Sequence, residues 1–181
     1  MDSQMTVSAR YKTPEGLDDL LLLSDGEALT GILFKGSPDA GKALAELERA
    51  GQSPKEEMPR SAAAVFRAAA RWLDAFFAGR EPCAAPPWRA TRQTPFQRAV
   101  QAAMLAIPRG ETRTYGQIAA DIAAARGIAK MSAQAVGQAV GANRLCLLVP
   151  CHRVVAAGGR LGGYGGGLEN KKALLRLEGS L

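Results

Sequence analysis

Cys151, His152 and Arg153 follow one another between Pro150 and Val154, and their side chains are the best suited to chemistry in the chain. His152 is the only histidine among 181 residues. An apolar run at residues 145–149 precedes this pentapeptide, and a glycine-rich stretch at residues 158–167 follows it. A thiol, an imidazole and a guanidinium between an expected buried strand and a loop predict a reactive site.

The chemistry that these residue types favour is nucleophilic attack by sulfur. A free thiol has a pKa of roughly 8.5, so little of it is thiolate at neutral pH. An imidazole can accept the thiol proton, and a carboxylate commonly orients that imidazole. Neighbouring side chains on a strand point to opposite faces, so Cys151 and His152 need a bridging water or a turn at Pro150. Glu169 and Glu178 are both candidates for the carboxylate, and Asn143 either donates to the site or caps a helix.

The second half of the chain must position these residues, and it has the pattern of a helical domain. Helices are predicted from Thr94-Pro95 to Ile107, from Thr114 to Gly127, over residues 133–142 after a Ser132 cap, and over residues 168–178. The second and third helices form a pair resembling a helix-turn-helix, although their connection is longer than the usual tight turn. The third helix contains mainly small residues, which predicts close approach of either a neighbouring helix or a DNA groove.

The charge distribution favours a DNA groove over a neighbouring helix as the partner of the third helix. From Thr91 onward there are twelve Lys and Arg residues against four Asp and Glu, whereas the preceding segment has eleven against thirteen. A basic domain is typical of proteins that bind a polyanion, most often nucleic acid.

The first half has the pattern of a separate α/β domain. Strands are expected at residues 6–11, 20–23 and 29–34, with a hairpin at Asp25-Gly26, and helices at residues 40–50 and 62–77. The proline-containing stretch at residues 81–94 is expected to link the domains. We therefore predict an N-terminal α/β domain over residues 1–86 and a mainly α C-terminal domain over residues 93–181.

Cysteine usage and hydropathy argue against disulfide-rich, zinc-binding and membrane proteins. Three cysteines, Cys83, Cys146 and Cys151, do not form a disulfide framework, and one histidine without a CxxC pair argues against a zinc site. No apolar run is long enough to span a membrane. We expect no metal, no cofactor, no membrane partner and a cytoplasmic location, where a reactive thiol stays reduced.

The motifs taken together closely resemble the O6-alkylguanine-DNA alkyltransferases, also called methylated-DNA–protein-cysteine methyltransferases. The resemblance rests on the 150–154 pentapeptide, on Asn143 before it, and on the stretch Gly163-Tyr164-Gly165-Gly166-Gly167-Leu168 after it. Further matches are Thr94-Pro95-Phe96-Gln97, residues 107–112, Thr114-Tyr115-Gly116, Ala135-Val136-Gly137 and Leu177-Glu178-Gly179. It covers residues 93–179 with high specificity and the first half more weakly.

The resemblance implies a fold and a reaction. The N-terminal domain would be ribonuclease-H-like, and a helix-turn-helix in the C-terminal domain would enter the minor groove of double-stranded DNA. An O6-alkylguanine, and as a second candidate an O4-alkylthymine, would be flipped into a pocket. Cys151 would take the alkyl group irreversibly in one turnover, and the protein would act as a monomer.

The same resemblance implies residue roles. His152 would be a water-linked base oriented by Glu178, with Asn143 beside the thiol. The pocket would be formed by Tyr115, Val154, Tyr164 and Gly165. DNA contacts would come from Ala133, Gln134, Ala135, Gly137 and Arg153.

The chain also departs from the family pattern. Gln134 stands where the family usually has an arginine that fills the gap left by the flipped base, which predicts weaker DNA binding. The connection around residues 123–130 is several residues longer than usual. Gln101 replaces a common tryptophan, Arg144 replaces a proline, and Cys146 falls at the edge of the pocket, where we expect it buried on a strand.

Three other functions fit part of the sequence. An alkyltransferase-like damage sensor would bind lesions without transfer, but such proteins lack the acceptor cysteine. A cysteine hydrolase using Cys151 and His152 would turn over many times on an ester or peptide. A DNA-binding regulator would read base sequence with the helix that carries Gln134.

Overall fold

The computed structural model describes residues 6–51, 59–82 and 84–181, so the expectation for Cys83 falls outside the described residues. The chain divides into two units, Met1–Thr91 and Arg92–Leu181. The first combines a sheet with helices and the second is mainly helical, as the sequence predicted. The described residues contain no helix that is long and apolar enough to cross a membrane.

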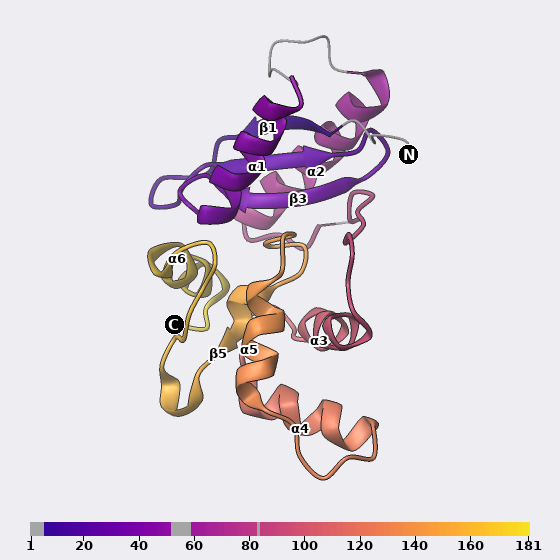
Figure 1. The fold of residues 1–181 in the computed structure, drawn as a ribbon. Coiled ribbons are helices and arrows are strands. Elements are labelled where there is room, and N and C mark those ends of the chain that lie inside the picture. The colour runs from indigo at the N-terminus through magenta and orange to yellow at the C-terminus, as the bar shows by residue number, and fades with distance from the viewer. Residues whose placement is uncertain (1–5, 52–58, 83) are drawn as a thin grey trace. The chain divides into compact units, whose positions relative to one another are not determined.

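In the first unit, a three-stranded antiparallel sheet has the order β1 (Val7–Tyr11), β2 (Leu20–Ser24) and β3 (Leu29–Phe34). Helices α1 (Pro38–Arg49) and α2 (Arg60–Phe77) lie on opposite faces of this sheet (Figure 1). All five residues of β2 are buried, since helices cover both faces of this central strand. A strand in this position needs apolar side chains in both directions, and four of its five residues are leucines. The predicted hairpin is confirmed. Gly26 has a positive φ of 97°, and the Asp25 carboxylate accepts hydrogen bonds from the amides of Glu27 and Ala28.

The end of the first unit differs from a simple linker. The Leu29 amide donates to the Pro87 carbonyl at 2.8 Å, and the Arg89 amide donates to the Leu29 carbonyl at 2.9 Å. The Arg89 guanidinium also pairs with Asp25 and Glu27. Residues 87–89 therefore belong to the edge of the first unit, and the boundary between the units follows Thr91.

In the second unit, α3 (Pro95–Leu105), α4 (Tyr115–Ala125) and α5 (Ala133–Gly141) pack against one another, and α6 (Leu168–Glu178) packs on the short 3₁₀ helix η1 (Cys151–Arg153) (Figure 1). Thr94 and Thr114 begin α3 and α4 with complete capping boxes, as their spacing predicted. The two-residue strands β4 (Arg113–Thr114) and β5 (Val154–Val155) pair in parallel. This pairing places Tyr115, which follows β4, close to the segment that contains Cys151. A second 3₁₀ turn, η2 (Ala157–Gly159), follows β5.

The apolar run at residues 145–149 is buried but is not the strand that its composition suggested. The Leu148 amide donates to the Cys146 carbonyl, the Val149 amide donates to the Leu145 carbonyl, and Leu147 has a left-handed φ of 73°. These local bonds fold the run into a tight turn. The apolar composition of residues 145–149 therefore reflects their burial and does not indicate a β-strand conformation.

Candidate active site

Cys151 begins η1, directly after the buried turn, and its side chain is 4% exposed. The amide Nδ2 of Asn143 donates to Cys151 Sγ at 3.1 Å and to the Val149 carbonyl at 3.0 Å. Asn143 Oδ1 in turn accepts from the Leu145 amide at 3.1 Å. Asn143 therefore connects the end of α5, the buried turn and the thiol, rather than serving only as a helix cap.

The thiol is poised to ionise near neutral pH. Hydrogen bonding with Cys146 and then with Asn143 and Tyr164 lowers the pKa of Cys151 to about 7, although burial acts in the opposite direction. About half of the thiol is then thiolate at neutral pH, against a few per cent for an ordinary cysteine. Cys146 is 5% exposed and is buried in the turn rather than on a strand.

His152 lies behind the thiol, fully buried, with its Nε2 at 3.2 Å from Glu178 Oε1. Burial lowers the pKa of His152, and the adjacent carboxylate partly offsets this effect, so the imidazole is neutral at physiological pH. A neutral imidazole can accept a proton, which is what a base requires. Glu178 ends α6 and is buried, whereas Glu169 at the start of α6 is exposed and pairs with Lys172. The fold thus places Glu178, and not Glu169, beside the imidazole.

Arg153, for which a DNA contact was predicted, is bonded within the second unit. Its Nε and Nη2 donate to the two oxygens of Glu178 at 2.9 and 2.7 Å, and its Nη1 donates to the Ile107 carbonyl at 2.6 Å. With 13% of its side chain exposed, the guanidinium is directed into the second unit. Although burial raises the pKa of Glu178, its contacts with His152 and Arg153 lower this pKa to about 2. Arg153 therefore keeps Glu178 ionised and fixed.

The loop after β5 forms a wall beside the thiol. The Tyr115 hydroxyl donates to the Gly163 carbonyl at 3.2 Å, and its ring approaches so closely that a Cβ on Gly162 would lie 3.0 Å from it. Burial, followed by the influence of Cys146 and Cys151, raises the pKa of Tyr164 well above its usual range. Val154 is fully buried beneath this wall, while Gly165 is exposed near the Gly141 carbonyl.

The small residues of α5 have different surroundings. The Tyr115 ring lies 3.8 Å from the position of a Cβ on Gly137, an ordinary contact distance, so this neighbour limits the size of the residue without requiring glycine. Ala133 and Gln134 are exposed at the start of the helix, and Ala135 is half-buried. Ser132 caps the helix by accepting from the amides of Gln134 and Ala135.

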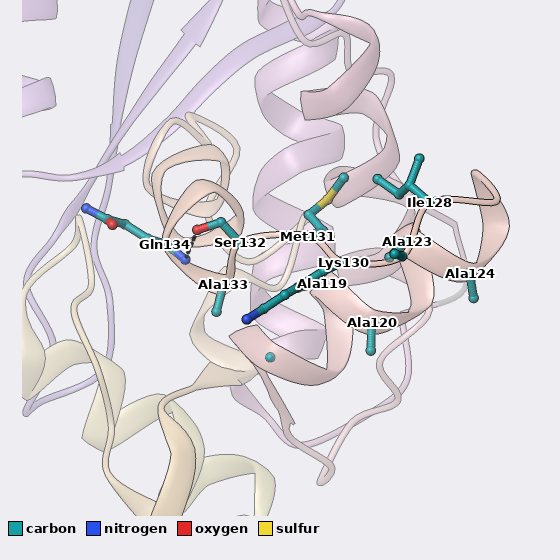
Figure 2. Close-up of a pocket in the computed structure, with 12 residues that line it drawn as sticks. Ala119, Ala120, Ala123, Ala124, Ile128, Lys130, Met131, Ser132, Ala133 and Gln134 are labelled. Carbon is teal, nitrogen blue, oxygen red and sulfur yellow. Dashed lines mark hydrogen bonds between the residues drawn. The ribbon is translucent and has the colours of Figure 1, made fainter.

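A groove of about 810 Å³ separates α4 from the start of α5, and the long connection at residues 126–132 forms part of its lining. Figure 2 shows the alanines of α4 along one side and Ser132 and Ala133 on the other. The Gln134 side chain points away from those alanines (Figure 2). Among residues 6–51, 59–82 and 84–181, no group of three or more His, Cys, Asp or Glu could hold a metal ion.

One residue near the site was missed from the sequence. Lys171 in α6 is completely buried, and its Nζ donates to three carbonyls around the wall. Its spacing was a signal: Lys171, Leu174, Leu175 and Glu178 recur at intervals of three and four residues and so share the buried face of α6. A lysine on such a face needs internal acceptors.

Replacing Asn143 with alanine is expected to raise the pKa of Cys151, because the thiolate loses a hydrogen-bond donor. The rate of Cys151 alkylation by iodoacetamide should rise through about pH 7 in the wild type and at higher pH in the variant. Gln138→Ala, an exposed change on the same helix, is the control. Overlapping pH profiles for Asn143→Ala and wild type would contradict the role of the amide.

The sequence of the chain is similar to a family model and to known proteins. Residues 95–180 match the family model described as 6-O-methylguanine DNA methyltransferase, DNA binding domain. The chain is 46% identical over 172 residues to the methylated-DNA–protein-cysteine methyltransferase of Methanosarcina acetivorans, covering 95% of this chain and 97% of that protein. It is 48% identical over 116 residues to the protein of the same name from Mycobacterium tuberculosis, covering 64% and 67%.

Solved structures agree with the sequence comparison. The crystal structure of M. tuberculosis O6-methylguanine methyltransferase superimposes with a TM-score of 0.71 at 34% identity, covering 97% of this chain and 94% of that chain. The crystal structure of M. tuberculosis OGT in complex with DNA has the same score and identity, covering 97% and 92%. Both halves of the chain are thus included in the likeness, and the chain belongs to the methylated-DNA–protein-cysteine methyltransferase family.

Proposed function

We propose that this protein repairs double-stranded DNA by moving the alkyl group of O6-alkylguanine to its own Cys151, once per molecule. The observation that carries the proposal is the buried thiol itself, with a pKa of about 7 and with Asn143 bonded to its sulfur. Family membership supplies the substrate class. The proposal includes O4-alkylthymine as a second substrate, a monomeric state and a cytoplasmic location.

The transfer is a displacement at the alkyl carbon. The thiol proton passes to His152 through a water, and the Cys151 thiolate attacks the carbon attached to guanine O6. An S–C bond forms as the C–O6 bond breaks, and the electron pair of that bond stays with guanine, which takes up a proton. The Tyr115 hydroxyl, which donates to the Gly163 carbonyl, lies on the wall of this pocket and is the candidate donor to the leaving base. None of these residues can cleave the new S–C bond of the thioether, so each protein molecule acts once.

The surroundings of the thiol match the roles proposed for them. Glu178 orients His152 at 3.2 Å, and Arg153 fixes Glu178. Tyr164 and Val154 form the pocket with Tyr115, and Gly165 leaves space at its rim. A site assembled in this way is largely buried until a flipped base enters it, which slows the reaction of the thiolate with other electrophiles.

We propose that α4 and α5 act as the helix-turn-helix, with the start of α5 against the minor groove. Ala133, Gln134 and Ala135 are at this end of the helix, and small side chains permit close approach of the DNA backbone. Gly137 follows them, although its contact with Tyr115 already requires a small residue. The first unit, with three antiparallel strands between two helices, would be the ribonuclease-H-like domain of the family.

The test is a stoichiometric transfer assay with duplex DNA containing one O6-methylguanine. Mass spectrometry is expected to show a gain of one methyl group on the peptide containing Cys151, with at most one equivalent transferred per protein. Tight binding without a change in mass would indicate a damage sensor. Continued turnover on an ester or peptide would indicate a hydrolase.

Replacing Gln134 with arginine is expected to tighten binding to undamaged duplex DNA by several-fold and to steepen the salt dependence by about one unit of slope. The added cation would neutralise a phosphate that glutamine leaves unpaired. Titrations at several salt concentrations measure both effects, and Ala102→Arg on the exposed face of α3 controls for net charge. Equal affinities and slopes for Gln134→Arg and wild type would show that this end of α5 does not face DNA.

A further inference from the structure

Lys171 is in the first turn of α6 and has no exposed surface. Lysine is rarely buried to this degree unless its ammonium is paired. Its Nζ donates to the Val154 carbonyl at 2.6 Å, to the Leu161 carbonyl, and to the Gly163 carbonyl at 3.4 Å. An ammonium has three protons, so these three carbonyls satisfy it completely.

The three carbonyls connect the acceptor segment to the pocket wall. Val154 directly follows η1, which contains Cys151, and Leu161 and Gly163 are in the loop that contains Tyr164. The Gly163 carbonyl accepts from Lys171 and from the Tyr115 hydroxyl at 3.2 Å. Lys171 is therefore the common donor that links β5 to the wall and, through Gly163, to the start of α4.

None of the described partners of Lys171 is a carboxylate. Its described ion-pair and hydrogen-bond partners are all carbonyls, and its Nζ is 5.9 Å from the centre of the Tyr164 ring. Burial lowers the pKa of Lys171 to about 8, while the negative charge of Cys151 acts to raise it. The same attraction must stabilise the thiolate, because an interaction between two charged groups is mutual.

We propose that Lys171 is a positioning residue for the alkyl transfer: its buried ammonium holds the wall loop against Tyr115 and keeps a positive charge near the Cys151 thiolate. This inference rests on the proposed function for its reaction. Its two parts, the clamp and the charge, make separate predictions. Loss of the clamp should misplace Tyr164 and the bound base, and loss of the charge should make the thiol harder to ionise.

Three variants separate these effects. Lys171→Met removes the donors and the charge but keeps a long side chain, and Lys171→Gln keeps two N–H donors without the charge. Lys172→Met is the matched control, because the neighbouring lysine extends outward to the exposed Glu169. Each variant is examined for its single-turnover methyl-transfer rate at saturating DNA, its Kd for DNA, and the pH profile of Cys151 alkylation by iodoacetamide without DNA.

Lys171→Met is expected to slow the transfer step by about tenfold or more, with the Kd for DNA unchanged, since a displaced pocket wall affects the reacting geometry. Both Lys171 variants should shift the iodoacetamide profile to higher pH, and Lys171→Gln should recover part of the transfer rate. Lys172→Met should match the wild type in all three measurements. The amide of Lys171→Gln can still hold the wall loop, so a shift of its pH profile reports the lost charge. A shift in Lys171→Met alone would report the lost clamp, because a displaced Tyr164 also changes the pKa of Cys151.

The clamp is overturned if Lys171→Met transfers at the wild-type rate, and the charge is overturned if Lys171→Gln has the wild-type pH profile. If Lys171→Met does not fold, the same measurements on Lys171→Gln decide the question, with Lys171→Arg as a variant that keeps the charge. Failure of the proposed function would look different: the wild type itself would transfer no methyl group. The iodoacetamide profile would still report on Lys171 in that case, because it needs no DNA.

Discussion

Replacing Cys151 with alanine is expected to abolish methyl transfer and to leave DNA affinity within about twofold of the wild-type value. The Cys151 sulfur combines a pKa of about 7 with a hydrogen bond from Asn143 at 3.1 Å. Its removal deletes the atom that forms the new bond. The surface that meets DNA, in contrast, is expected at the start of α5. Mass spectrometry of the protein and a binding titration with the same lesion duplex measure the two effects.

Cys146→Ala is the matched control, because it deletes the other buried thiol of the same segment. This variant should still accept one methyl group on Cys151, but more slowly near neutral pH, since hydrogen bonding with Cys146 is the largest influence that lowers the pKa of Cys151. A methyl group on Cys146 in the Cys151→Ala protein would reassign the acceptor. Loss of DNA binding in Cys151→Ala would show that the thiol supports the fold of the second unit.

Much of the fold was predictable because its signals are local. The Thr94 and Thr114 capping boxes need only residues three positions apart, and both helices begin where they predict. The Asp25-Gly26 hairpin follows from a glycine that tolerates a positive φ. In each case the deciding interaction lies within a few residues.

The features that the sequence did not predict depend mainly on contacts between residues that are distant in sequence. The bonds from Arg153 Nε and Nη2 go to Glu178, twenty-five residues later, which no local pattern predicts. Residues 145–149 have the composition of a buried strand, but local hydrogen bonds turn them back on themselves, so burial alone does not specify a strand. Lys171 resembles any helical lysine until three loop carbonyls surround it. The choice of Glu178 over Glu169 likewise required the position of α6.

Replacing Glu178 with glutamine is expected to have the largest effect on stability. The change leaves the Arg153 guanidinium, 13% exposed, without its anionic partner, and breaking such a buried pair costs about 3–5 kcal/mol. The lowered pKa of Glu178, about 2 against 4.5, follows from the same contacts and corresponds to about 3 kcal/mol of stabilisation. Methyl transfer should also slow, because His152 loses the carboxylate that orients it.

The pH dependence has a defined direction. A carboxyl whose pKa is lower in the folded state contributes its full stabilisation above its unfolded pKa of 4.5, and this is lost as the pH falls toward about 2. Denaturant unfolding at pH 7 and pH 3 should therefore show a loss in the wild type that is smaller in Glu178→Gln, which has no proton to bind at this position.

Glu169→Gln is the control at the opposite end of α6, where the carboxylate is exposed beside Lys172, and it should unfold like the wild type at pH 7. If Glu178→Gln were as stable as Glu169→Gln at pH 7, the pairing of Arg153 with Glu178 would contribute nothing net. The desolvation of both groups would then cancel their attraction. The purpose of the pair would be to orient His152, and only the transfer rate would report its loss.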